Sequence, residues 1–173
     1  MSSFKDNSFR IRLAFAMACT LVTAGCFQPM LAGPSGGALV EDLRSIKVQP
    51  INDRIGHYLG NELSFSLNGS GSEVREKYKL FITLSQKVQT PIIDTVSGRA
   101  SSANVLIDAE YRLVESSTNR QIASGSGFSM ASYDRTAQRF ANLRAAREAE
   151  IRSARALAEQ IRVRLSADMT RRY

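Results

Sequence analysis

Few side chains in this chain are spaced for catalysis. Asp108 and Glu110 are two residues apart, so on a strand they share one face, where paired carboxylates can act as acid and base. His57 is the single histidine, and no acid or nucleophile is spaced to work with it. Charged strand residues are mostly solvated. We therefore interpret the carboxylates as a solvent face beside Arg112, and His57 as a structural or surface residue.

The composition argues against metal and cofactor chemistry. One histidine and two cysteines cannot supply a histidine-rich or four-cysteine metal site. No segment matches the G-x-S-x-G turn of esterases or the GK[ST] ending of a phosphate loop. We predict no catalytic residues, no metal site and no cofactor. An enzyme stays open as an alternative reading, which requires a pocket with convergent polar groups.

The first 25 residues have the order of a signal peptide. Three basic residues, Lys5, Arg10 and Arg12, precede an uncharged apolar run over 13–22 that is too short to span a bilayer. An ordinary signal peptide with a chance cysteine, or a buried N-terminal helix, are the alternatives. The run ends at Thr23-Ala24-Gly25-Cys26.

This ending resembles the lipobox of bacterial lipoproteins, with Thr23 where leucine is usual. The resemblance implies cleavage after Gly25, S-diacylglycerol on the Cys26 thiol and an N-palmitoyl group on its new amine. Two or three acyl chains anchor a protein stably. Phe27 follows the cysteine, and resemblance to enterobacterial lipoproteins implies export to the outer membrane when this residue is not aspartate.

Three parts of the chain are predicted. Residues 1–25 are the signal peptide, 26–43 are the lipidated cysteine and a flexible tether rich in proline and glycine, and 44–173 form a single periplasmic domain. Within that domain, apolar spacing predicts a strand at 46–48, a helix from about 53 to 67, strands near 78–84, 105–113 and 121–133, and a helix over 134–168.

This order predicts an α+β fold: a small antiparallel four-stranded sheet with two helices packed on one face. The apolar stripe of the last helix begins at Phe140 and Leu143. Its arginines alternate with acids at helical spacing, which is typical of a solvent face. The net charge of +7 favours anionic partners, but the helix lacks the concentrated basic excess of a groove-reading helix, and we predict no nucleic-acid binding.

The sheet face turned away from the helices mixes apolar and basic residues. It would present Phe81 and Leu106 beside Lys79 and Arg112, a mixture that favours a partner over plain solvent. The connection over 90–102 is long for a hairpin and carries Arg99. With Lys87 nearby, this end could contact an anionic amphiphile, since arginine suits phosphate groups.

The chain resembles the LptE family of lipopolysaccharide-assembly lipoproteins, in its alphaproteobacterial form. The likeness begins at Gly25-Cys26-Phe27-Gln28-Pro29-Met30-Leu31 and continues in shorter matches along the chain: Ile46-Lys47-Val48, Ile51-Asn52-Asp53-Arg54-Ile55-Gly56, Ala109-Glu110-Tyr111-Arg112-Leu113, Ser132-Tyr133-Asp134 and Ala141-Asn142-Leu143. The resemblance implies a sheet with two helices, lipid anchoring in the outer membrane on its periplasmic side, and no catalysis.

It also implies a place inside the LptD β-barrel, as plug and assembly factor for lipopolysaccharide insertion into the outer leaflet. By position and charge we predict lipopolysaccharide contacts at Arg99, Lys87, Lys79 and Arg112, and barrel contacts at Phe81 and Leu106. An accessory lipoprotein of a phospholipid-transport system is the alternative. Such a subunit should copurify with an inner-membrane transporter rather than with a barrel.

Overall fold

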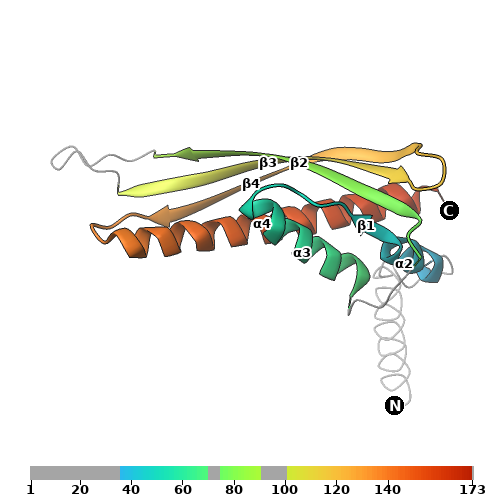
Figure 1. Ribbon diagram of the computed structural model, residues 1–173, viewed down its shortest axis with the longest axis horizontal. Coiled ribbons are helices and arrows are strands. Elements are labelled where there is room, and N and C mark those ends of the chain that lie inside the picture. The colour runs from blue at the N-terminus through green and yellow to red at the C-terminus, as the bar shows by residue number, and fades with distance from the viewer. Residues whose placement is uncertain (1–35, 70–74, 91–100, 173) are drawn as a thin grey trace, which may run out of the picture. The chain divides into compact units, whose positions relative to one another are not determined.

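The computed structural model describes residues 36–69, 75–90 and 101–172 (Figure 1). The fold lies in Leu39–Tyr173, one of the two compact units of the chain, and of the other, Met1–Ala38, only the start of one helix is described. The elements are α2 (Gly36–Arg44), β1 (Ile46–Val48), α3 (Arg54–Asn68), β2 (Tyr78–Gln89), β3 (Ser102–Glu115), β4 (Gln121–Asp134) and α4 (Arg139–Thr170).

The four strands form one sheet in the order β1-β2-β3-β4. The α+β class is confirmed, and the β2–β3 and β3–β4 pairs are antiparallel as predicted. The expectation of an entirely antiparallel sheet is wrong, because β1 runs parallel to β2, with Ile46 opposite Tyr78. The cause is α3, a helical crossover that returns the chain to the end of the sheet from which β1 started.

One face of the sheet is covered by α3 and α4 (Figure 1). Alternate residues of β3 point into this inner face and are buried: Ala103, Val105, Ile107, Ala109, Tyr111 and Leu113. Leucines at helical spacing on α3 belong to the same buried cluster, namely Leu59, Leu63 and Leu67. The core is therefore a layer between the inner face and two helices.

Two glycines of β4 let large groups approach the sheet. A Cβ at Gly125 would lie 2.6 Å from the hydroxyl oxygen of Tyr111, its cross-strand partner. A Cβ at Gly127 would lie 3.1 Å from Cδ2 of Leu157 on α4. The small inner residues of β4 thus provide the space that the aromatic ring and the helix occupy.

The buried stripe of α4 starts later than predicted. Its first buried residues are Ala149 and Glu150, whereas Phe140 is 81% exposed and Leu143 is 59% exposed. The start of α3 is bound to Glu150 through Arg54. The first ten residues of α4 therefore extend past the start of α3, and none of them is buried.

Residues 36–43, the last part of the predicted tether, are helical and belong to α2. Leu39 and Leu43 are one helical turn apart and both are buried in the core. A salt bridge of 3.0 Å joins Asp42 to Lys77 just before β2. The helix was not predicted because glycines and a proline precede its two core leucines. Residues 26–35 of the predicted tether lie outside the described residues.

A two-pronged ion pair joins the two long helices. Arg54 donates from Nε to Oε2 of Glu150 at 2.9 Å and from Nη2 to Oε1 at 2.7 Å. The Glu150 side chain is only 6% exposed, while that of Arg54 is 57% exposed. The hydrogen bonds and the charge of Glu150 raise the pKa of Arg54. Such bidentate pairs fix geometry as well as charge, so Arg54 sets where α3 meets α4.

We predict that Arg54→Ala lowers the free energy of unfolding by about 2–3 kcal/mol, because it leaves the Glu150 carboxylate buried without its cation. Glu150→Gln should cost less, since Arg54 can turn to solvent. Urea denaturation measures both. Arg155→Ala is the control: its 3.8 Å pair with Glu62 is exposed and worth at most about 1 kcal/mol. An Arg54→Ala loss no larger than the control's contradicts this role.

Candidate functional site

The outer face of the sheet, opposite the helices, gathers most of the predicted contact residues. Phe81 lies opposite Arg112, and Lys87 lies opposite Leu106 in the β2–β3 register. Phe81 and Leu106 are half-buried, and Lys87 and Arg112 are exposed. Val114, opposite Lys79, differs from the rest of this face: it is buried beside a register shift between Leu113 and Val114.

Phe81 and Arg112 form a cation–π pair. The guanidinium carbon of Arg112 lies 4.9 Å from the ring centroid of Phe81. The planar cation shields part of the ring from water. Phe81, a predicted barrel contact, and Arg112, a predicted lipopolysaccharide contact, therefore stack on each other. Together they present an apolar ring beneath a positive charge.

Lys79 is already engaged by an acid within the chain. Its Nζ lies 3.6 Å from Oε1 of Glu76, and Nζ of Lys47 lies 3.3 Å from Oε2 of the same carboxylate. The hydroxyl of Ser116 donates to Glu76 at 3.1 Å. Burial alone would raise the pKa of Glu76, but the Lys47 and Ser116 hydrogen bonds and the two lysine charges lower it. An incoming anion must compete with Glu76 for Lys79.

The predicted basic contacts fall at two separate places. Lys79 and Lys87 are eight residues apart on β2, or about 26 Å at strand spacing. Lys79 and Arg112 belong to the end near β1, and Lys87 to the far end. Arg99 lies outside the described residues, as do Gly25 and Cys26.

Two exposed apolar residues on β4 were missed by the sequence reasoning. Phe128 is 50% exposed and Met130 is 56% exposed, and Met130 lies directly opposite Leu106. The signal was present: in residues 125–131 small residues alternate with serine, phenylalanine and methionine. In this segment of β4 the small residues face the helix and the large ones face outward, the reverse of the usual amphipathic strand.

The remaining candidate residues lie on the surface. Asp108 and Glu110 are exposed on the outer face, opposite Ser85 and Thr83. His57 is exposed on α3, and its Nε2 lies 3.2 Å from Nδ2 of Asn61. Within the part of the chain that the structure describes, no three His, Cys, Asp or Glu side chains gather in a metal-binding arrangement.

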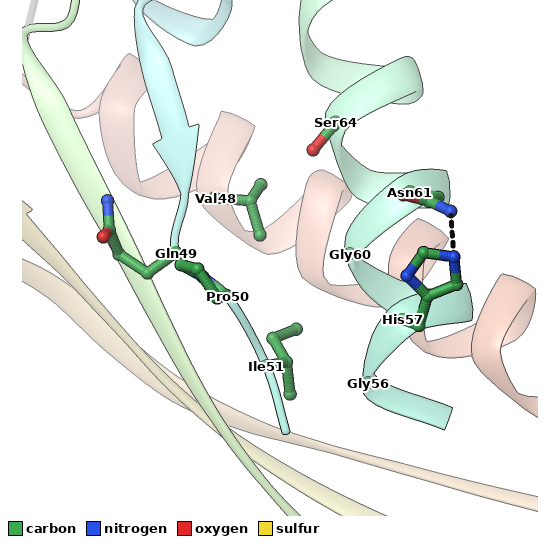
Figure 2. A pocket seen from close by; sticks show the side chains of 9 residues that line it. All are labelled: Val48, Gln49, Pro50, Ile51, Gly56, His57, Gly60, Asn61 and Ser64. Atoms are coloured by element: carbon green, nitrogen blue, oxygen red, sulfur yellow. Dashed lines mark hydrogen bonds between the residues drawn. The ribbon is translucent and has the colours of Figure 1, made fainter. Parts of the chain in front are cut away.

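His57 stands at the rim of a groove between α3 and residues 48–51 (Figure 2). The groove holds about 230 Å³, and Val48 and Ile51 point from the strand side toward α3. On the helix side, Gly56 is required, because a Cβ there would lie 2.6 Å from Cγ2 of Ile51. The nine described lining residues include no carboxylate beside the imidazole.

The family of this chain follows from comparison with known proteins. The model of the LptE family, described as lipopolysaccharide-assembly, matches residues 43–165. The chain belongs to the LptE family. A search of curated proteins finds no match. Among the described helices, none has an apolar stretch long enough to cross a membrane.

Solved structures share the fold of this LptE-family chain. A candidate lipoprotein from Caulobacter crescentus has a TM-score of 0.65 at 20% identity, covering 79% of this chain and 98% of that protein. The minor lipoprotein from Acinetobacter baumannii has a TM-score of 0.56 at 15% identity, covering 72% and 91%. Lipoprotein B from Nitrosomonas europaea has a TM-score of 0.50 at 14% identity, covering 72% and 83%.

The Glu76 cluster predicts an acid-sensitive step in the stability of this LptE-family chain. Because the pKa of Glu76 is lower in the folded than in the unfolded chain, its contribution is complete above the unfolded pKa and is lost as pH falls through the folded pKa. The difference in unfolding free energy between the wild type and Glu76→Gln should therefore shrink below about pH 4.3. Urea denaturation across this range measures it; a pH-independent difference contradicts the assignment.

Proposed function

We propose that this chain is an outer-membrane lipoprotein, anchored through acylated Cys26 after cleavage behind Gly25, that faces the periplasm. It assembles with an LptD-like β-barrel as plug and assembly factor for lipopolysaccharide insertion into the outer leaflet, without catalysis. Its membership of a lipopolysaccharide-assembly family supports this role. The observation that carries the proposal is the outer sheet face, where apolar and basic side chains lie exposed together.

The apolar part of this face suits a protein partner. Leu106, Phe128 and Met130 lie on two adjacent strands, with Met130 directly opposite Leu106 and Phe128 one diagonal step away. Side chains at such spacings contact one another and form one patch. Exposed apolar patches bordered by polar residues mark interaction surfaces. We assign the barrel contact to this patch, with Phe81 further along the same face.

The basic part suits the phosphate groups of lipopolysaccharide. Lys87 is exposed at the far end of β2, and Arg99 belongs to the following connection. Lys79 is held by Glu76 and Arg112 is stacked on Phe81. Lys87 has no ion pair with any residue that the structure describes, so it can bind phosphate without first breaking one. We propose that Lys87, together with Arg99 by its position and charge, makes the primary contacts and that Lys79 and Arg112 contribute more weakly.

We predict that Phe128→Ser/Met130→Ser weakens barrel association by about tenfold or more, since burying each apolar side chain contributes on the order of 1 kcal/mol or more. The protein is purified from outer membranes in mild detergent, and its partners are identified and quantified. The mass of the N-terminal peptide reports the acyl groups on Cys26 in the same preparation.

Val163→Ser is the matched control, because Val163 is also half exposed but lies on α4. Stoichiometric recovery of a large β-barrel, reduced by the double variant and not by the control, supports the proposal. Recovery of inner-membrane transporter subunits instead favours phospholipid transport and overturns it. Recovery of no partner also overturns the plug role and returns attention to the groove beside His57.

Lipopolysaccharide binding should depend on the far end of the sheet. Lys87→Asp/Arg99→Asp is expected to weaken binding of lipopolysaccharide micelles by about tenfold or more, with a smaller salt dependence, because two charge-assisted contacts are lost. Arg155→Asp/Arg164→Asp makes the same charge change on exposed positions of α4 and should bind nearly as the wild type. Equal binding by both double variants rules out the contact assignment.

A further inference from the structure

The edge of the sheet formed by β4 is long. The strand has 14 residues, and among the strands that the structure describes β3 is its one neighbour in the sheet. In an antiparallel strand the N–H and C=O groups of a residue point to the same side, and successive residues alternate sides. Every second residue of β4 therefore presents its main-chain groups outward, where another strand could pair with them.

Two side chains of α4 bind this edge. Arg152 donates from Nη2 to the carbonyl oxygen of Ser132 at 2.9 Å. Gln160 donates from Nε2 to the carbonyl oxygen of Phe128 at 3.0 Å. The donors are eight helix residues apart, about 12 Å, and the acceptors are four strand residues apart, about 13 Å. The spacing of the two donors along the helix therefore matches the spacing of the two acceptors along the strand.

Gly127 lets α4 come this close. A Cβ at this position would lie 3.1 Å from Cδ2 of Leu157 and 3.4 Å from Oε1 of Gln160. The 3.1 Å contact is tighter than ordinary van der Waals packing, so a larger residue would require the Leu157 side chain or the helix to shift. Gly127 thus allows the side-chain amide of Gln160 to reach the main chain of β4.

We propose that Arg152 and Gln160 close the β4 edge against strand addition by a second copy of this chain. Residues 128, 130 and 132 all point their main-chain groups outward. An antiparallel β4–β4 pair with a two-fold axis at Met130 would place Phe128 opposite Ser132 of the other copy. That pair would use the carbonyl oxygens of Phe128 and Ser132, the two that α4 already occupies.

The pairing would also bring apolar surface together. Phe128 and Met130 are half exposed on the outer face, and the two-fold axis would place both copies of these side chains in one continuous patch. A second copy therefore fits this edge in both main-chain and side-chain chemistry. The two α4 donors hold the chain monomeric and leave the outer face, rather than the edge, for other partners. This inference is independent of the proposed function.

The test is Arg152→Met/Gln160→Met, which removes both donors and keeps side-chain length and helix propensity. Sedimentation velocity of the purified full chain in detergent, without any barrel, should show a dimer with a dissociation constant at least about tenfold lower than that of the wild type. Arg155→Met is the matched control and should sediment as the wild type. A double variant that remains monomeric with unchanged circular dichroism overturns the proposal.

Two further variants keep the result decisive. Met130→Pro in the double variant removes an outward N–H and should restore the monomer; a dimer that persists shows association through apolar side chains, and overturns strand addition. Met130→Cys in the double variant should form an intermolecular disulfide, because directly opposed residues of such a pair lie about 5.5 Å apart between Cα atoms. If the double variant fails to fold, Gln160→Met alone with Met130→Cys replaces it, and no increase in cross-linking over Met130→Cys alone contradicts the proposal.

Discussion

Burial of one sheet face beneath α3 and α4 is the constraint on which the rest of the structure depends. The helices need a surface that they can approach closely, and β4 provides it with Gly125, Gly127 and Ser129 on its inner side. Its large residues, Phe128 and Met130, must then face outward. The close packing of α4 and the exposed apolar patch therefore both follow from the alternation of small inner and large outer residues in this part of β4.

Much of the fold could be predicted from the sequence, because its strongest patterns coincide with burial. In β3 each apolar residue of the alternation from Val105 to Leu113 is buried, and the leucine spacing of α3 was equally clear. The direction of β1 was not predictable from local spacing, since a three-residue strand carries no sign of parallel or antiparallel pairing. The start of the α4 stripe depends on where α3 begins, a tertiary fact that Phe140 and Leu143 do not encode.

The candidate site was harder to predict, because exposure and charge pairing depend on neighbours distant in the chain. Phe81, Leu106 and Arg112 do lie on the outer face, as alternation predicts. That Lys79 shares Glu76 with Lys47 depends on β1 pairing beside β2. Phe128 and Met130 were overlooked because a strand full of glycine and serine gives a weak apolar signal. Cys26, Gly25 and Arg99 lie outside the described residues.

Strand order in the sheet follows chain order, and this has a kinetic consequence. Each strand pairs with its nearest predecessor, and only residues 116–120 separate β3 from β4. Loop closure is therefore inexpensive in entropy, and low contact order favours fast folding of the meander β2-β3-β4. Arg54 and Glu150, 96 residues apart, close a much larger loop. We expect docking of α3 onto α4 to be the late event in folding, with unfolding starting where that contact opens.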